Sequence, residues 1–546
     1  MVLTGKNLTL FIVVCILLLS STARFKAVVK AQDGDLIVDP SREEPGFYKT
    51  IQEAIDNASS GQTIFVVNGT YYENLFIYKS SISLVGQGRD VTIIDGRQFS
   101  NVISILADNV TVRGFHIRNS GISSDSAIRI EHAKGNCITD NRLTDSFDGV
   151  GVQTSSNNTI SNNVATDNSN GIRIYLSSNN RISGNTVSSS AYDGVRVDTS
   201  SSNIISNNSI LNNYDGLGLY TSSNNLVTGN VISGNWDGIA LSASTNNTIT
   251  RNSIFSNIRG ILLAHTSINN IFYFNNLNNN PQVDSQPQTA VFPNSWVFKD
   301  KGNYWSDYNG TDAHTDGVGD IPYRIDQYNL DPKPLMGPFS DYYLLLHAEL
   351  FQIDMISNAT VTDFAFETGA ETGNRIIRFN VIGREEDGFF CRIEIPDALM
   401  AHPTLLLVGE EEIIPKNLSS SDSTCSSTYF SYPHSNRTVS IISSTTLNLL
   451  GQMLDKYLQL QTEIGRQNDT YNALFNNYSR LWNSYDQLKQ AYDSLKSSYD
   501  SLLNAQSENA TGRQNMLYII AAGTAVFLGS LVYLSKRAQT EPGGQS

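Results

Sequence analysis

A repeat of about 22 residues runs through the first half of this 546-residue chain and restricts its fold more than any other feature. One glycine file has spacings of 22, 23, 22, 22 and 22 residues: Gly149, Gly171, Gly194, Gly216, Gly238 and Gly260. Two asparagine files keep the same period, one at Asn136, Asn158, Asn180, Asn203, Asn225, Asn247 and Asn270, the other at Asn141, Asn163, Asn185, Asn208, Asn230, Asn252 and Asn275. Three files in register indicate a repeat architecture.

The apolar residues of each repeat alternate, as in Ile172 and Ile174 or Val195 and Val197. A period of two residues predicts short strands. The repeat is too short for a propeller blade and lacks the helical half of a leucine-rich repeat. We therefore predict a right-handed parallel β-helix, in which equivalent side chains stack at about 4.8 Å per coil. Asparagines at the bends are expected to form hydrogen-bonded ladders, so these files are structural.

The residues on either side of the repeats predict caps for this stack. Residues 48–55 form a short amphipathic pattern, with Ile51, Ala54 and Ile55 on one side. The open end of a stacked fold must be covered, and this helix would cover it. We assign residues 35–300 to the β-helix with its N-terminal cap and residues 301–340 to an Asp/Gly-rich capping loop.

The C-terminal half predicts two further parts and an oligomer. Alternating runs at 375–381, 389–395 and 438–442 indicate a β-sandwich-like domain over residues 341–445. From Leu450 to Leu502 apolar residues then recur at +3 and +4 for over seven heptads, with Gln467 as the one polar break. This pattern predicts a coiled-coil stalk over residues 446–512 and a homo-oligomer formed through it. The expected fold class is mainly β, with a β-helix head, a sandwich, this stalk and a single C-terminal transmembrane helix.

Both ends of the chain carry membrane-targeting features. Lys6 precedes an apolar run and small residues, which is typical of a signal peptide, here residues 1–31. Residues 516–534 carry no charge and are long enough for a single membrane-spanning helix. Lys536 and Arg537 follow, so the tail 535–546 is expected in the cytoplasm and the bulk of the chain outside. Thirteen N-x-S/T sequons in the outside region permit glycosylation.

Several stretches resemble a known family. These are "YKTIQEAIDNASSGQTIFVVNGTYYENLFI", the "SNNTISNN…DGI" coils and "GNYWSDYNGTDAHTDGVGDIPY" at 302–323. Together they look like the NosD-type, pectin-lyase-like right-handed β-helix proteins of archaeal cell surfaces, over roughly residues 35–340. The stretch "GFFCRIEIPDALM" is similar to a small β domain appended to such members. The resemblance implies the fold; proteins of this type are often described as copper-binding.

Charge and cysteine usage limit the partners. The net charge of −15 argues against nucleic acid as a partner. Copper, the third and least favoured function, would need clustered His, Cys or Met, and no such cluster is present among seven His and six Met. Cys391 and Cys425 share one domain, and whether they pair is left open.

Two groups of residues are candidate sites. Asp312, Asp316 and Asp320 alternate around glycines, a pattern that suits calcium; the alternative is an ordered loop that closes the β-helix. The second group would form an exposed glycan-binding strip beside the glycine file: Tyr192, Tyr214, Trp236, Asp193, Asp215, Arg173 and Arg196. The favoured alternative is that Asp-Gly is turn chemistry and the aromatic rings are pillars at the corner of the stack.

These features predict a non-enzymatic cell-surface protein, anchored in the membrane, that serves adhesion, envelope structure or contact with an extracellular glycan. The main alternative is a tethered polysaccharide lyase or epimerase, because enzymes of the resembled fold use Asp, Arg and Lys on an exposed face. The sequence predicts no certain cofactor and no catalytic residue.

Overall fold

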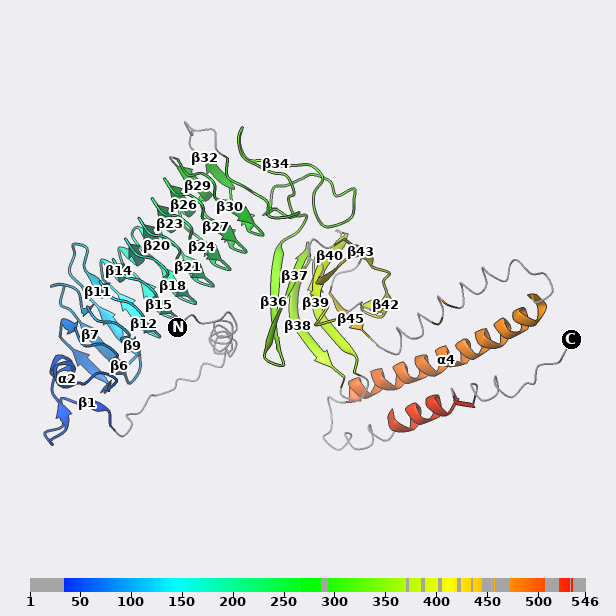
Figure 1. The fold of residues 1–546 in the computed structure, drawn as a ribbon, viewed down its shortest axis with the longest axis horizontal. Coiled ribbons are helices and arrows are strands. Elements are labelled where there is room, and N and C mark those ends of the chain that lie inside the picture. Colours follow the sequence, from blue (N-terminus) through cyan, green and yellow to red (C-terminus); the bar gives the residue numbers. More distant parts are fainter. Residues whose placement is uncertain are drawn as a thin grey trace. The chain divides into compact units, whose positions relative to one another are not determined.

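The repeats fold into a parallel β-helix in the computed structural model (Figure 1). The structure describes residues 34–264, 266–285, 293–369, 373–383, 388–400, 405–419, 424–433, 436–443, 453, 456, 471–505, 520–530 and 532–533. Each coil contributes one strand to each of three parallel sheets, so the coils stack in chain order. The predicted mainly β fold with a parallel β-helix is confirmed.

The three sheets, called A, B and C, have 12, 11 and 10 strands. Sheet A consists of β2 (Phe47–Tyr48), β1 (Leu36–Val38), β3 (Thr63–Val66), β6 (Ser83–Gly86), β9 (Thr111–Arg113), β12 (Cys137–Thr139), β15 (Thr159–Ser161), β18 (Arg181–Ser183), β21 (Ile204–Ser206), β24 (Leu226–Thr228), β27 (Thr248–Thr250) and β30 (Ile271–Tyr273). Sheet B consists of β4 (Gly69–Tyr71), β7 (Thr92–Asp95), β10 (His116–Arg118), β13 (Arg142–Thr144), β16 (Val164–Thr166), β19 (Thr186–Ser188), β22 (Ser209–Leu211), β25 (Val231–Ser233), β28 (Ser253–Phe255), β31 (Asn276–Asn278) and β33 (Tyr304–Trp305). Sheet C consists of β5 (Leu75–Ile77), β8 (Ile103–Ile105), β11 (Ser126–Glu131), β14 (Asp148–Gln153), β17 (Asn170–Tyr175), β20 (Asp193–Asp198), β23 (Asp215–Tyr220), β26 (Asp237–Ser242), β29 (Arg259–Ala264) and β32 (Val283–Ser285).

The interior of the β-helix is filled by the alternating apolar residues, such as Ile172 and Ile174, which are fully buried. The asparagine files lie at the bends and form the predicted ladders. Asn208 Nδ2, for example, donates to Asn230 Oδ1 at 2.9 Å, and Asn230 Nδ2 donates to Asn252 Oδ1 at 2.9 Å. Each amide also donates to a backbone carbonyl of the preceding coil, so these buried polar groups are satisfied.

The glycine file marks a close approach between coils. A Cβ on Gly216 would lie 2.5 Å from the carbonyl oxygen of Gly238 and 2.7 Å from Ile232 Cγ2. Only glycine fits this position because the next coil and the core both occupy the space. The file is therefore a packing requirement, and its glycines are the second residues of the six-residue strands of sheet C from β14 to β29.

Both ends of the β-helix are covered. The predicted cap helix is α2 (Ile51–Asn57), whose N-cap residue is Thr50, and its buried residues are the predicted Ile51, Ala54 and Ile55. At the other end Trp305 is buried and stacks on Tyr323, with ring centroids 4.3 Å apart. A small antiparallel pair, β34 (Tyr323–Arg324) and β35 (Leu330–Asp331), belongs to this C-terminal cap.

Two five-stranded antiparallel sheets follow the cap and enclose a second hydrophobic core. One sheet has the order β36 (Phe339–Leu346), β37 (Glu349–Ser357), β40 (Phe389–Pro396), β44 (Cys425–Tyr432) and β43 (Lys416–Leu418). The other has the order β38 (Thr360–Thr368), β39 (Arg375–Ile382), β45 (Arg437–Ser443), β41 (Leu405–Val408) and β42 (Glu411–Glu412).

The cysteines of this part do not form a disulfide. Cys391 on β40 lies opposite Phe430 of β44, and Cys425 on β44 lies opposite Pro396 of β40. The two cysteines are thus five residues apart along the paired strands, which is roughly 17 Å. A disulfide requires Cα atoms within about 7 Å, so the pairing that the sequence left open is ruled out by the register.

A second compact unit, residues 446–546, contains α4 (Tyr471–Ala505), which lies within the predicted stalk 446–512. Of the predicted membrane span 516–534, the structure describes residues 520–530 and 532–533, which are helical. Within the described residues, no helix has both the length and the apolar character required to cross a membrane. The predicted signal peptide at 1–31 lies outside the described residues.

Candidate functional site

The outer face of sheet C collects the polar residues that the sequence singled out. Its strands pair in parallel with Asp193 opposite Asp215, and Asp215 opposite Asp237. Asp148 occupies the same position two coils before Asp193, with Asn170 between them. We call Asp148, Asp193, Asp215 and Asp237 the acidic file. Because every coil repeats the same turn and strand, one residue type recurs at one place on the face.

The residues directly before Asp193, Asp215 and Asp237 form the aromatic strip, defined by Tyr192, Tyr214 and Trp236. These side chains are 57%, 54% and 45% exposed, respectively. The rings of Tyr214 and Trp236 stack with centroids 5.9 Å apart and planes inclined by 8°. Tyr214 and Trp236 thus stack at the corner, as the favoured alternative expected of the rings, but all three side chains are exposed and none belongs to the buried core. They lie on the surface because the interior of each corner is already filled by the ladder amides and the glycine file.

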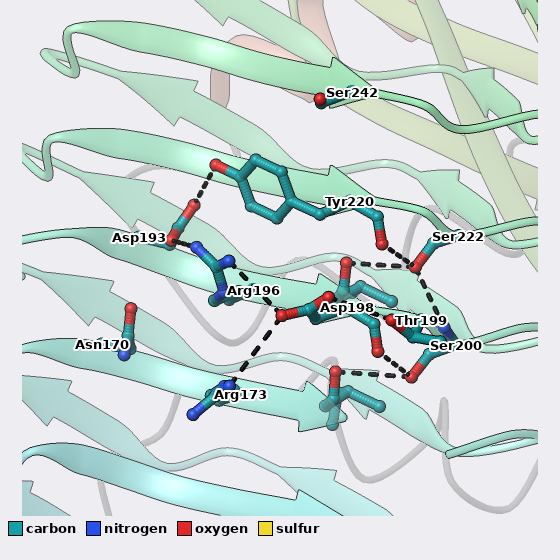
Figure 2. Close-up of polar contacts among 12 residues, drawn as sticks. Asn170, Arg173, Asp193, Arg196, Asp198, Thr199, Ser200, Tyr220, Ser222 and Ser242 are labelled. Carbon is teal, nitrogen blue, oxygen red and sulfur yellow. Dashed lines mark hydrogen bonds and ion pairs between the residues drawn. The ribbon is translucent and has the colours of Figure 1, made fainter. Parts of the chain in front are cut away.

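The carboxylate of Asp193 lies under this surface and is tied by two groups (Figure 2). Arg196 Nη1 donates to Asp193 Oδ2 at 2.9 Å, and the Tyr220 hydroxyl lies 2.8 Å from Asp193 Oδ1. Burial raises the pKa of Asp193, and the positive charge of Arg196 opposes that shift. The guanidinium of Arg196 also lies over the ring of Tyr220, 4.2 Å from its centroid.

The two contacts of the Tyr220 hydroxyl indicate that Asp215 carries a proton in this arrangement. The Tyr220 hydroxyl lies 2.8 Å from Asp193 Oδ1 and 2.9 Å from Asp215 Oδ2. A phenol has one hydrogen and can donate to only one of these carboxyl groups, so the other contact requires a proton on a carboxyl oxygen. Arg196 favours the charged form of Asp193, and the proton therefore belongs to Asp215.

The pKa values of the acidic file agree with this assignment. Burial, together with the negative charge of Asp193, raises the pKa of Asp215 to about 7. Burial also raises the pKa of Asp148 to about 6, although Asn170 Nδ2 donates to its Oδ1 at 2.9 Å. Among the described residues, Asp148 Oδ2 and Asp215 Oδ1 have no hydrogen-bond partner. Asp148 and Asp215 thus keep their protons to pH values well above the range in which a carboxyl group usually titrates.

The arginines beside the strip are held by aspartates. Arg196 Nη2 and Arg173 Nη2 lie 3.4 Å and 3.9 Å from Asp198 Oδ2, so Asp198 stands between the two guanidinium groups (Figure 2). Arg259 donates to both carboxylate oxygens of Asp237, at 2.5 Å and 2.8 Å, and lies 3.0 Å from Asp284.

All seven predicted strip residues lie on or beside this face, from Arg173 to Trp236. The sequence reading missed Asp198 and Tyr220 as members of the site. Gly218 was the feature of the sequence that could have pointed to Tyr220. It occupies the outward-facing position that Arg173 and Arg196 hold in the two preceding coils. A Cβ on Gly218 would lie 2.4 Å from both Asp193 Oδ1 and Tyr220 Cε2, so glycine makes room for the tyrosine to reach two carboxyl groups.

The predicted calcium residues are used within their own loop. Asp312 accepts hydrogen bonds from the backbone of Asp316 and Gly317, and Asp316 accepts one from Val318. Asp320 accepts from the backbone of Ala313 and contacts His314 Nδ1. In the part of the chain that the structure describes, no group of three or more His, Cys, Asp or Glu side chains is arranged to hold a metal ion. The geometry thus supports the closing-loop alternative, and Asp312, Asp316 and Asp320 do not converge on one point.

Comparison with known proteins agrees with the fold. A family described as "Right handed beta helix region" matches residues 57–191 and 100–236, and one described as "Periplasmic copper-binding protein (NosD)" matches residues 189–310. The fold and its polar face define the class of right-handed parallel β-helix proteins. Within that class, the two family models together match residues 57–310, which supports the resemblance to NosD-type β-helix proteins that the sequence indicated.

Curated relatives match only a short part of the chain. A probable pectinesterase/pectinesterase inhibitor 17 of Arabidopsis thaliana is 38% identical over 126 residues, which is 21% of this chain and 22% of that protein. Pectinesterase 2 of Citrus sinensis is 35% identical over 116 residues, 19% of this chain and 21% of that protein. The chain spans about a fifth of the length of these relatives.

Solved structures are similar at low identity. The A-module of the mannuronan C-5 epimerase AlgE6 of Azotobacter vinelandii is 16% identical with a TM-score of 0.36, and the match covers 50% of this chain and 89% of that one. The enzymatically active domain of tailspike protein 2 of bacteriophage CBA120 is 11% identical with a TM-score of 0.38, covering 72% and 76%.

The residues of the NosD-matched segment do not fit a copper site. Residues 189–310 contain one histidine, His265, and neither cysteine nor methionine. Copper ions in proteins are held mainly by imidazole, thiolate and thioether groups, usually several together. The copper-binding description therefore applies to the family and not to the side chains of this segment.

Proposed function

We propose that this chain is an extracellular, non-enzymatic β-helix protein that binds glycan through the aromatic strip. The observation that carries the proposal is the exposed stacked pair Tyr214 and Trp236, beside the hydrogen-bonded polar face of sheet C. Sugar rings stack on aromatic side chains, and polar groups at the rim select among their hydroxyls. The β-helix should be accessible to protease on intact cells if the predicted anchor at 516–534 displays it.

The burial of the acidic file favours binding over catalysis. The side chains of Asp193 and Asp237 are each 3% exposed, and each is bonded to an arginine. A carboxylate that takes part in bond cleavage must reach the substrate within hydrogen-bond distance. Asp193 and Asp237 stabilise the stack from below the strip, so the surface offered to a ligand consists mainly of the aromatic rings.

Trp236→Ala is expected to weaken glycan binding roughly tenfold and to change the melting temperature by about 2 °C or less, because the ring is exposed. A screen on immobilised glycans identifies the ligand, and calorimetry on the best one gives the affinity. Phe255→Ala is the matched control, since Phe255 is an exposed aromatic residue on β28 of sheet B.

Two results would contradict this proposal. If the Trp236→Ala and wild-type proteins bind the glycan with equal affinity, the aromatic strip is not the binding surface. Release of reducing or unsaturated sugar ends by the wild-type protein would overturn the non-enzymatic part.

We further propose that α4 pairs with α4 of a second copy. Leu481, Tyr485, Tyr492 and Leu495 of the heptad pattern are all exposed on this helix within a single chain. An apolar stripe of this kind is buried when helices associate. Tyr485→Asp should shift the protein toward monomer in sedimentation experiments, because it places a charge in the seam. Gln487→Asp, off the seam, should not; a wild-type protein that remains monomeric at high micromolar concentration would refute the pairing.

A further inference from the structure

We propose that the aromatic strip selects glycans that carry no carboxylate, and that aspartates beside it enforce this choice by occupying the arginines. The inference rests on the proposed glycan binding and adds the chemical class of the ligand. It follows from the ion pairs of sheet C, three arginines of which lie close to the strip: Arg173, Arg196 and Arg259.

The first two arginines converge on one aspartate. Asp198 Oδ2 lies 3.4 Å from Arg196 Nη2 and 3.9 Å from Arg173 Nη2, and Asp193 holds the other terminal nitrogen of Arg196 at 2.9 Å (Figure 2). A uronic acid carboxylate is usually recognised by the paired N–H groups of a guanidinium. Here Arg196 already donates to Asp193 and Asp198, and Asp198 is also the ion-pair partner of Arg173, so a uronate at either guanidinium group would have to compete with Asp198.

The third arginine is unavailable for the same reason. Arg259 is bonded to both oxygens of Asp237 and also to Asp284. The side chain of Asp237 is 3% exposed, so this pair is shielded and costly to break. A ligand carboxylate at this coil would face Asp284 and Asp237, and Arg259 already has a carboxylate partner for each of its three side-chain nitrogens.

The local charge therefore disfavours anionic ligands. The face presents four carboxylates, those of Asp193, Asp198, Asp237 and Asp284, against three guanidinium groups. Adding a negative ligand to this face places like charges together, which lowers affinity. The affinity for uncharged sugar rings is not lowered by these carboxylates, because stacking on Tyr214 and Trp236 requires no opposite charge.

The test uses pairs of glycans that differ only in charge. An array carries neutral polysaccharides and several uronic acid oligosaccharides, each beside its carboxyl-reduced form, which keeps the ring configuration and length. We expect binding to uncharged glycans, and for each pair bound we expect the reduced form to bind roughly tenfold or more tightly than the uronate. A uronate bound as tightly as its reduced form would overturn the inference while leaving the proposed function intact. Absence of binding to every glycan would overturn both.

A variant of the whole protein tests the role assigned to Asp198. Asp198→Asn removes the carboxylate that Arg173 and Arg196 share, so affinity for uronic acid oligosaccharides should rise roughly threefold to tenfold. Affinity for the neutral glycan should not change. Asp90→Asn, on an exposed loop between β6 and β7, removes the same charge without releasing an arginine and controls for net charge. If both variants raise uronate affinity equally, Asp198 acts through net charge and not by occupying Arg173 and Arg196. That result would contradict the role proposed for Asp198.

Discussion

Replacing Asn230 by alanine is expected to destabilise the β-helix by roughly 3–5 kcal/mol. Asn230 Nδ2 donates to the carbonyl of Ile205 and to Asn252 Oδ1, and Asn230 Oδ1 accepts from both nitrogens of Asn208. Alanine removes all of these hydrogen bonds. Asn252 Oδ1 keeps the backbone N–H of residue 230 and Asn208 Nδ2 keeps the carbonyl of Ile182, but each group that is left unpaired carries a desolvation cost. Thermal unfolding followed by circular dichroism should show a melting temperature lower by roughly 10 °C.

Val231→Ala is the matched control for Asn230→Ala. Val231 is the next residue on β25, is 40% exposed and loses a comparable number of atoms without touching the ladder. It should shift the melting temperature by about 2 °C or less. Equal shifts in melting temperature for the two variants would mean that the amide ladder contributes no more to stability than the packing of a surface side chain does.

The Asp215 carboxyl is expected to make the protein less stable as pH rises from about 4 to about 7. Its pKa is near 4 in the unfolded chain and is raised to about 7 in the fold. Between these values the unfolded state has lost the proton that the folded state keeps, so raising the pH favours unfolding. The stability given by the neutral form is complete below pH 4 and is lost through pH 7. Asp148, with its pKa raised to about 6, acts in the same direction.

Asp215→Asn isolates this effect because asparagine stays neutral at every pH. The difference in melting temperature between this variant and the wild type should be small at pH 4 and should grow to roughly 5 °C in favour of the variant above pH 7. Asp237→Asn serves as the control, since it removes the charged partner of Arg259 and should destabilise the protein even at neutral pH. A constant difference between Asp215→Asn and wild type from pH 4 to pH 8 would show that Asp215 is charged throughout.

The stacked core was predictable because its causes are periodic. The glycine file, the ladder asparagines and the buried Ile172 and Ile174 recur at the same place in every coil, and each recurrence has a local physical reason. The outward position of Arg173 and Arg196 followed from the alternation along a strand. The cap helix α2 was predictable from three apolar positions on one side.

The remainder depended on contacts between coils that periodicity does not describe. Alternation placed Tyr220 on the outer face but could not tell that its hydroxyl reaches back one coil to Asp193. The exposure of Trp236 depends on which groups already fill the corner of the stack. The separation of Cys391 from Cys425 depends on strand register, which is set by the pairing of β40 with β44. The spacing of Asp312 and Asp316 is common to a cation site and to a loop closed by its own backbone.

The amide ladders also determine how a protein of this kind can change its length. Apart from carbonyls of their own coil, ladder residues bond to the coil before and the coil after, as Asn208 does with Asn185 and Asn230. A duplication or deletion of one whole coil therefore joins surfaces that already match, whereas a change of a few residues breaks both ladders at once. We therefore expect a change of one whole repeat to be tolerated, and a duplicated coil that carries Tyr214 or Trp236 would extend the aromatic strip by one more ring.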